Sequence, residues 1–382
     1  MSIKFDVPYN WEKNLIKYYI SKKEHIEMVY GRAEDWYPQW RKTDKGIQIS
    51  LDNIFEQNNI LLSEWIKFNY LLNWTSHWNQ EYKKEYRDKF FNHVKMLRDN
   101  WIKIVTIWNL FLLEAVIKEI SWIEVAASIT LEVDSLVKLK TICKLWVKYV
   151  FLSKVLLKNF NALKNISIFI AKKYPHIKLF LLANDPCLNH CLFTNYHNET
   201  LSLLTWNNKS CNSFCRLQCT KKFSTDLESL ISASFIRPED IRTYEQIWFN
   251  YIKLCDRKQT TEWLKNSLNA YIKECYNGEL SDLMAPWSKY DWVYPTTKEV
   301  SIQNLIEKWL NSYRDQLRFS PRINNKDLDW YLDFFIKNKP YWCMNEDCDT
   351  CWYCKNIAYK YVKNSNLLLQ SNLNNAIKSC FK

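Results

Sequence analysis

Short apolar runs alternate with amphipathic stretches along the first two thirds of the chain. The runs with the composition of buried strands cover residues 3–7, 26–30, 66–72, 102–107, 123–129, 147–152, 177–183 and 249–254. Helical patterns lie between most of them, at 11–20, 80–99, 110–118, 133–145, 155–173 and 226–233. Buried strands separated by helices indicate a parallel sheet, and eight strands close a (β/α)8 barrel. We therefore predict an α/β fold with a TIM-barrel-like core. A doubly wound open sheet is the alternative, although no GxGxxG motif supports a dinucleotide fold.

The pattern changes in two places. The segment 186–225, after the seventh strand, is predicted to be a long irregular insertion, and such loops are usually functional. A helix at 258–276 follows the eighth strand, and the regular alternation stops near residue 285. Helical patterns near 299–313 and 326–337 and a basic helix ending near 363 come next. We predict a barrel domain over 1–285 and a C-terminal helical module over 286–382.

Tryptophan stands where glycine is expected. The chain has 19 Trp and 3 Gly, whereas a usage of about 7% would give roughly 27 Gly. Five predicted helices end in a Trp that directly precedes an apolar strand. The residue at that joint commonly turns through the left-handed region, where Gly is usual and a bulky side chain costs about 1–2 kcal/mol. The five residues are Trp65, Trp101, Trp122, Trp146 and Trp248.

We interpret most of these tryptophans as glycines of the living protein, encoded by UGA in a genetic code that reassigns this codon. Five such costs would consume most of a domain's stability of roughly 5–15 kcal/mol. Trp36, Trp74 and Trp292 follow Asp or Asn, where Asp-Gly and Asn-Gly turns are common. Trp11 and Trp263 lie inside helical patterns and are candidates for genuine tryptophan. The alternative is a truly Trp-rich, Gly-poor protein.

The charge balance and hydropathy narrow the class of protein. The formal net charge is +12, which permits binding of RNA or another polyanion. A solvated, lysine-rich surface is the alternative, because the lysines are spread along amphipathic helices. No apolar run has the length of a membrane span, and the N-terminus lacks a signal-peptide pattern. We therefore expect a cytoplasmic protein without a membrane partner.

The insertion after the seventh strand carries the first group of cysteines. The apolar run 179–183 ends in Asn-Asp-Pro, and Cys187, His190, Cys191 and His197 follow. In a reducing compartment, clustered cysteines indicate metal or cluster ligation before disulfides. Four thiolates suit a [4Fe–4S] cluster, and zinc is the rival. The other candidate cluster ligands in this insertion are Cys211, Cys215 and Cys219.

A second group of cysteines lies near the C-terminus, at Cys343, Cys348, Cys351 and Cys354. Two consecutive CxxC steps let backbone turns direct thiolates at one ion or cluster. We predict zinc or a second iron–sulfur cluster here. A redox-active CxxC is less favoured, since no thioredoxin-like βαβ unit surrounds it.

Polar residues at strand ends are further candidate site residues, because the carboxyl ends of barrel strands face the active site. Lys253 lies at the end of the eighth strand, Asp256 and Arg257 follow it, and Arg237 precedes it. The cations Arg237, Lys253 and Arg257 could bind a carboxylate or phosphate of a substrate. Arg237-Pro238-Glu239-Asp240 is equally typical of a helix start. His190 and His197 are candidate acid–base groups or additional ligands, with loop hydrogen bonding as the alternative.

Several stretches resemble the collagenase-like peptidase family of undetermined catalytic type (peptidase U32), which includes iron–sulfur proteins that hydroxylate RNA bases or quinone precursors without oxygen. The matching stretches cover nearly the whole chain: VPYNW (7–11), FNYLLN (68–73), VTIWN (105–109), ANDPCLNHC with His197, FIRPEDIRTYEQIWFNYIKLCDR (235–257), AYIKECYNGELSDLM (270–284) and CxxCWYC. FIRPED and the paired cysteines are the specific motifs. The family pattern has Gly at Trp65, Trp101, Trp108, Trp146, Trp248 and Trp352.

The resemblance implies a barrel with a cysteine-ligated [4Fe–4S] cluster. Cys187 and Cys191 match the family's cysteine loop, and Cys219 matches a third cysteine. Cys211, Cys215 or Cys255 could supply the fourth ligand. The function hypothesis is an iron–sulfur-dependent enzyme of the oxygen-independent hydroxylase type, acting on an RNA base or a small aromatic substrate. The alternatives are a collagenase-like protease, for which neither GxSxG nor HExxH is present, and a non-catalytic metal-bound scaffold or RNA-binding partner.

Overall fold

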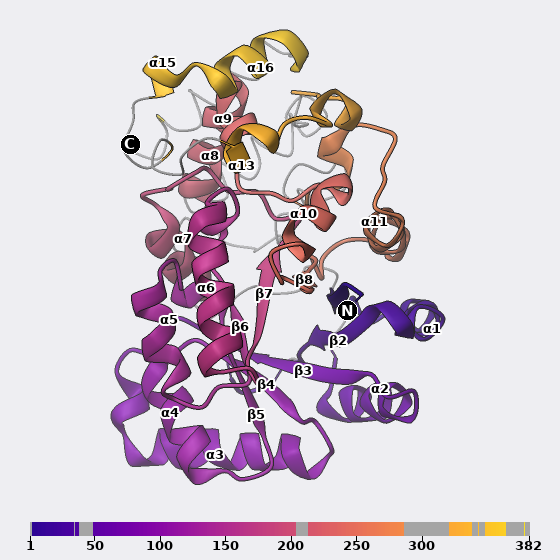
Figure 1. Ribbon diagram of the computed structural model, residues 1–382. Helices are drawn as coiled ribbons and strands as arrows, with labels where there is room; N and C mark the ends of the chain where they lie inside the picture. Colours follow the sequence, from indigo (N-terminus) through magenta and orange to yellow (C-terminus); the bar gives the residue numbers. More distant parts are fainter. Residues whose placement is uncertain are drawn as a thin grey trace.

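Eight parallel strands form a closed barrel (Figure 1). The computed structural model describes residues 2–33, 35–37, 49–203, 213–285, 321–337, 343, 348–363 and 378. Each strand pairs with the next, and β1 also pairs with β8. All eight predicted strands are confirmed, as is the barrel-type fold. Their bounds are β1 Lys4–Pro8, β2 Ile26–Gly31, β3 Lys67–Leu72, β4 Ile104–Ile107, β5 Glu124–Ala127, β6 Tyr149–Phe151, β7 Lys178–Leu182 and β8 Tyr251–Lys253.

Helices connect the strands and cover the outside of the barrel. The connecting helices are α1 Lys13–Ile20, α2 Leu51–Ser63, α3 Lys84–Asp99, α4 Leu110–Glu119, α5 Leu136–Cys143, α6 Phe160–Lys173, α9 Glu228–Ser232, α10 Ile241–Glu245 and, after β8, α11 Thr261–Lys273. The sequence pattern did not single out α2, which begins at Ser50 with a capping box formed with Asn53. Buried aliphatic side chains between this helical layer and the sheet make the main core.

A second, smaller core fills the barrel itself. Its buried side chains alternate along the strands with those of the outer core, as expected for strands with two buried faces. They comprise large aromatic and aliphatic residues, so this part of the barrel is packed. The members are Met28, Ile104, Ala126, Tyr149, Phe151 and Phe180.

The five predicted helix-to-strand joints all have left-handed backbones. The φ angles are 64° at Trp65, 64° at Trp101, 66° at Trp122, 61° at Trp146 and 69° at Trp248. At Trp65 the backbone N–H donates to Leu62 O, and that of Ile66 donates to Leu61 O. This pair of bonds is the Schellman motif, in which Gly usually holds the left-handed position. The indoles contribute little packing, since Trp65 is 92% exposed and Trp122 is 85% exposed.

The other tryptophans fall into two groups, those with a left-handed backbone and those without. Trp78 and Trp352 are also left-handed. Trp11 has a φ of 73°, so our interpretation of it as an ordinary helical residue is wrong. Trp74 is 1% exposed, lies outside the left-handed group, and its indole N–H donates to Ser202 O. The expected Asn-Gly turn at Trp74 is therefore wrong, because this indole is a packed core element.

Trp36, Trp108 and Trp263 are similar to Trp74, because their indoles make specific contacts and their backbones are not left-handed. None of them is in the left-handed group. The indole N–H of Trp108 donates to Thr130 O, and that of Trp263 donates to Asp282 O. The ring of Trp36 packs edge-on against three neighbouring rings. Glycine is therefore not required at Trp36 or Trp108 by the backbone. Trp292 lies outside the described residues.

The insertion after β7 is more regular than predicted. It contains α7 Thr194–Leu203 and α8 Ser213–Thr225, so its description as irregular is wrong. Helix α7 is tied to the loop after β3, since Thr75 N–H donates to Ser202 Oγ at 3.0 Å and Trp74 bonds the same residue. The insertion therefore reaches across from the end of β7 to the end of β3.

The described part of the C-terminal module packs onto the barrel domain. It comprises a 3₁₀ turn Asn325–Leu328 and the helices α13 Asp333–Lys337, α15 Cys348–Cys351 and α16 Tyr353–Tyr361. Leu328, Tyr331, Phe335 and Ile357 belong to the main core. Figure 1 shows α15 and α16 at one end of the molecule, next to α9 and α13. The predicted helix at 299–313 lies outside the described residues. None of the helices that the structure describes is both long and apolar enough to cross a membrane.

Candidate functional site at the end of strand β7

Asn184 holds together the ends of two neighbouring strands. This residue follows β7, and its side-chain oxygen accepts a hydrogen bond from Cys255 N–H at 2.7 Å. Its amide nitrogen donates to Cys255 O at 2.9 Å. Asn184 is fully buried, so these bonds are shielded from water and fix the loops that follow β7 and β8. Cys187 and Cys255 are thereby placed on the same face of the barrel.

Lys154 provides a half-buried positive charge beside the first cysteine of the loop. It opens the turn after β6, and its Nζ lies 2.7 Å from Cys187 Sγ and 3.2 Å from Asp185 Oδ2. Burial acts to lower the pKa of Lys154, but Asp185 and Cys187 outweigh it and raise this pKa above its ordinary value. Lys154 therefore stays protonated and donates to the sulfur. Sequence reasoning missed this residue, because only the barrel brings the ends of β6 and β7 together.

Cys191 and Cys219 form a thiol pair across the insertion. The hydrogen bond from Cys219 lowers the pKa of Cys191 to about 6, and the same bond raises the pKa of Cys219. Cys187 and the buried Cys215 are close enough to act on the charge of Cys219. The predicted ligands Cys187, Cys191, Cys215 and Cys219 are thus brought together. Cys211 lies outside the described residues.

The donor set of this site consists of cysteine sulfurs. Thiolate sulfurs are soft ligands, which favour iron–sulfur clusters or zinc. Among the residues that the structure describes, no three His, Cys, Asp or Glu side chains surround one point as ligands of a single metal ion.

Lys253 faces the barrel interior, paired with Asp6. Its Nζ lies 2.6 Å from Asp6 Oδ2 and 3.5 Å from the ring centre of Tyr30. Burial raises the pKa of Asp6 to about 6, although Lys253 acts to lower it. Such a carboxyl group can exchange a proton near neutral pH. Tyr30 also donates a weak hydrogen bond to Cys255 Sγ at 3.7 Å, so this ion pair adjoins the strand ends that carry the thiols.

Two polar atoms of this interior layer have no hydrogen-bond partner among the described residues. They are Asp6 Oδ1 and Asn69 Nδ2, and both side chains are fully buried. Asn69 Oδ1 accepts a hydrogen bond from Thr106 Oγ1 at 2.8 Å, which fixes the amide. An unpaired acceptor and an unpaired donor in one layer are costly unless a further polar group satisfies them. Sequence reasoning missed Asp6 as a site residue. The one signal in the sequence was a charged residue within an apolar strand.

The remaining predicted acid–base residues lie at the margin of this site. His190 is exposed and left-handed, with a φ of 47°. His197 is half-buried on α7, and its backbone N–H donates to Phe193 O. Asp256 and Arg257 are half-buried in the loop after β8.

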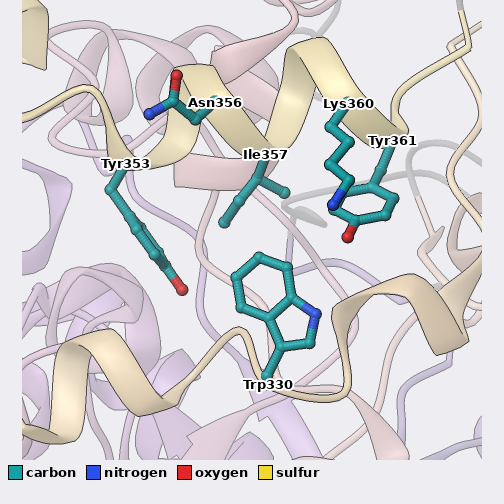
Figure 2. Close-up of a pocket in the computed structure, with 6 residues that line it drawn as sticks. All are labelled: Trp330, Tyr353, Asn356, Ile357, Lys360 and Tyr361. Carbon is teal, nitrogen blue, oxygen red and sulfur yellow. The ribbon is translucent and has the colours of Figure 1, made fainter.

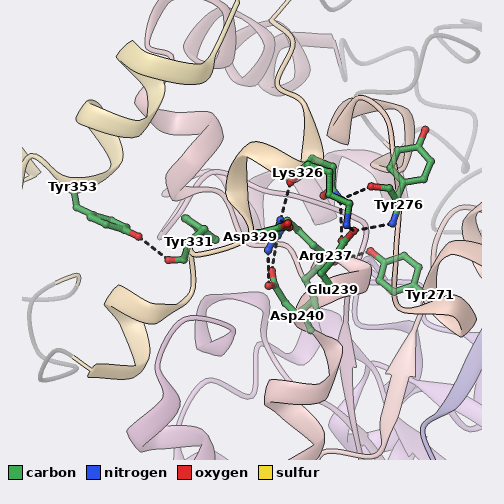
Figure 3. Close-up of polar contacts among 11 residues, drawn as sticks. Arg237, Glu239, Asp240, Tyr271, Tyr276, Lys326, Asp329, Tyr331 and Tyr353 are labelled. Carbon is green, nitrogen blue, oxygen red and sulfur yellow. Dashed lines mark hydrogen bonds and ion pairs between the residues drawn. The ribbon is translucent and has the colours of Figure 1, made fainter.

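Arg237 joins the barrel domain to the C-terminal module (Figure 3). Its guanidinium is fully buried and binds both oxygens of Asp240, each at 2.8 Å. The same group donates to Asn325 O at 2.7 Å and to Asp329 at 3.2 Å. Its donors therefore point at protein atoms. This geometry favours the structural alternative for Arg237, at the start of the 3₁₀ turn Pro238–Asp240, over a contact with substrate.

The C-terminal cysteines also gather. Burial raises the pKa of Cys354 to about 12. The nearby sulfurs of Cys343, Cys348 and Cys351 raise this pKa further by charge repulsion. Lys158, in the loop before α6, lies close enough to act on Cys343 and Cys354. Burial lowers the pKa of Lys158 to about 8, and its ammonium lies over three aromatic rings, those of Phe235, Tyr331 and Phe335.

The structure thus defines a (β/α)8-barrel protein with two thiol clusters, one at the end of β7 and one in the C-terminal module. No protein-family model matches the chain. An uncharacterized protease of Methanocaldococcus jannaschii is 23% identical over 187 residues, which cover 49% of this chain and 46% of that protein. The match spans less than half the length of this curated relative.

Two solved structures are similar in outline. The U32 peptidase Mk0906 aligns with 67% of this chain and 93% of its own, at 10% identity and a TM-score of 0.48. The carboxyl transferase domain of Rhizobium etli pyruvate carboxylase aligns with 85% of this chain and 61% of its own, at 11% identity and a TM-score of 0.32.

Proposed function

We propose that the chain is an iron–sulfur-dependent enzyme of the oxygen-independent hydroxylase type, acting on an RNA base or a small aromatic substrate. The observation that carries the proposal is the gathering of Cys187, Cys191 and Cys219 beside the cation of Lys154. Cys215 lies with them and is the fourth ligand in this proposal. When bound, the cluster would supply electron transfer at the barrel mouth.

The interior layer of the barrel would bind the substrate. Asp6 Oδ1 offers an acceptor and Asn69 Nδ2 a donor, a combination that matches the edge of a nucleobase or another polar ring. Lys253 would hold a developing negative charge on such a ring, because its ammonium is already buried beside Asp6. Asp6 would exchange the proton, since its pKa of about 6 lies near the working pH.

A peptidase is the second candidate, because the curated relative bears the name protease. A cysteine peptidase needs a base that accepts the thiol proton. The group in contact with Cys187 is Lys154, whose raised pKa keeps it protonated. Lys154 therefore does not provide the base of a catalytic dyad, and burial raises the pKa of the Cys187 thiol above its ordinary value.

Anaerobic purification with an absorption spectrum and assays of iron and sulfide tests the proposal. We expect a brown protein that contains both elements, and loss of both in Cys187→Ser. Cys275→Ser is the matched control, because Cys275 is exposed and follows α11, outside the insertion that carries the thiol group. A colourless protein that carries only zinc would contradict the proposal. Cleavage of casein or gelatin that persists in Cys187→Ser, without iron, would favour the peptidase.

A further inference from the structure

The C-terminal module contains an aromatic hollow of about 240 Å³. Figure 2 shows Ile357 of α16 facing Trp330, with Tyr353 on one side and Tyr361 and Lys360 on the other. The ring centres of Trp330 and Tyr361 are 6.0 Å apart, and those of Trp330 and Tyr353 are 6.4 Å apart. The volume lies below the roughly 300–1,000 Å³ of pockets for drug-sized ligands, so it suits one planar ring system.

The walls of the hollow are held by the rest of the fold. Tyr353 stacks on Phe334 at 3.9 Å, and its hydroxyl donates to Tyr331 O at 2.7 Å. Tyr331 in turn donates to Ile231 O of α9. Trp330 remains 44% exposed, although it lies in ring contact with two tyrosines. It is outside the left-handed group of tryptophans, so a genuine indole is expected here.

The helix above the hollow, α16, contains Lys355 and Lys360 and no Asp or Glu. Lys355 is paired with Asp349, which precedes the helix, so Lys360 is the lysine at the hollow. The Nζ of Lys360 lies 4.9 Å from the ring centre of Tyr361, at the rim of the hollow. An exposed aromatic surface beside a lysine matches an unpaired base followed by its phosphate, because any base can stack and the phosphate needs a cation.

We propose that Trp330, Tyr361 and Lys360 form a stacking site for one unpaired base of a single-stranded RNA. The site adjoins the cysteines that precede α16, and α16 packs on α9, which follows the helix bearing Cys219. Bound RNA would therefore lie on the same side of the barrel as the thiol group. The inference deepens the proposed function, since it selects RNA over a small aromatic molecule as the substrate class.

Fluorescence anisotropy of the full chain with short labelled oligouridine and oligoadenosine tests the site. We expect both to bind, and a duplex RNA to compete poorly. Trp330→Ala and Tyr361→Ala should each weaken binding by about five- to a hundredfold, the usual range for loss of one stacked base. Lys360→Ala should reduce the slope of log affinity against log salt by about 0.7, the loss of one phosphate contact on a single strand.

Tyr359→Ala is the matched control, because Tyr359 lies on the same helix but is 93% exposed and outside the hollow. It should leave the affinity unchanged. Equal losses in Tyr359→Ala and Tyr361→Ala, unchanged binding in Trp330→Ala, or binding of an acidic peptide in place of RNA would each overturn the inference. Circular dichroism melting confirms that each variant is folded.

The iron assay keeps this inference apart from the proposed function. If the protein contains iron and sulfide but Trp330→Ala leaves its RNA affinity unchanged, the stacking site is refuted and the iron–sulfur proposal is supported. If the protein is colourless but Trp330→Ala lowers its RNA affinity, the stacking site is supported and the iron–sulfur proposal is refuted.

Discussion

The ammonium of Lys154 lies 2.7 Å from the sulfur of Cys187. Lys154 follows β6 and Cys187 follows β7, so the contact is made by the neighbouring ends of two barrel strands. A protonated lysine in this position stabilises negative charge on the sulfur. If Cys187 binds a cluster, the same contact stabilises the more negative, reduced state.

Replacement of Lys154 should therefore change the electronic properties of a bound cluster. We expect Lys154→Met to retain iron and to lower the reduction potential by on the order of 60 mV, corresponding to about 1.4 kcal/mol for a charged hydrogen bond. An anaerobic redox titration measures this shift. Lys144→Met is the control, since Lys144 is exposed at the end of α5. An unchanged potential in Lys154→Met would exclude this role of the ammonium.

Glycine at the left-handed joints should stabilise the protein. Each of Trp65→Gly, Trp101→Gly and Trp146→Gly removes a bulky side chain from a backbone with φ above 60°. We expect each to raise the free energy of unfolding by about 1–2 kcal/mol. Urea denaturation measures the change. Trp263→Gly is the control and should be strongly destabilising, because Trp263 is buried inside α11.

The origin of these tryptophans is testable without mutation. Sequencing of the coding DNA should show UGA at Trp65, Trp101 and Trp146, and mass spectrometry of peptides from the native organism should show Gly there. UGG codons at these three positions would refute the hypothesis of a reassigned codon. Trp74 and Trp263 should be encoded by UGG, because their indoles are buried and hydrogen-bonded.

Loss of Arg237 should destabilise the contact between the barrel domain and the C-terminal module. Arg237→Met leaves Asp240 buried without its bidentate partner, and breaking such a pair costs about 3–5 kcal/mol. We expect a lower free energy of unfolding and faster hydrogen exchange across residues 321–337. Arg242→Ala, which removes an exposed arginine, should cost at most about 1 kcal/mol. A stable Arg237→Met protein with weakened substrate binding would instead support a substrate-binding role.

Two buried histidines should make the fold acid-sensitive. Burial lowers the pKa of His77 and of His93 to about 4, whereas an unfolded histidine titrates near 6.5. The unfolded chain therefore binds more protons between these values, so stability is retained above pH ~6.5 and falls as the pH drops toward 4.

Linkage predicts a loss of roughly 2 kcal/mol per histidine at pH 5. The hydroxyl groups of Tyr37 and Tyr86 contact the two ring nitrogens of His77 at 3.2 and 3.1 Å. Urea unfolding at a series of pH values should show a smaller acid-induced loss in His77→Gln. His176→Gln, at an exposed position, should leave the pH dependence unchanged. If the unfolding free energy of His77→Gln depended on pH as strongly as that of the unchanged protein, the prediction would be contradicted.

Local pattern was sufficient for the strands, the joints between helix and strand, and the position of the cysteine loop. A buried strand is visible as an apolar run, and a helix end that turns left-handed is visible as a residue between two patterns. Both depend on neighbours within a few positions of the chain. For this reason Trp65 and Trp248 were located correctly, whereas Trp74 was not, because its indole is buried against Ser202 of a distant helix.

Tertiary structure alone decided which side chains meet at the site. Asp6 and Lys253 are 247 positions apart and become partners only when β1 and β8 close the barrel. Lys154 reaches Cys187 because β6 and β7 are neighbours. Arg237 is directed toward Asp240 and Asn325 by the module that packs over it. Sequence periodicity reports which face of an element is buried, but a contact between distant elements depends on strand order and closure, which no local pattern encodes.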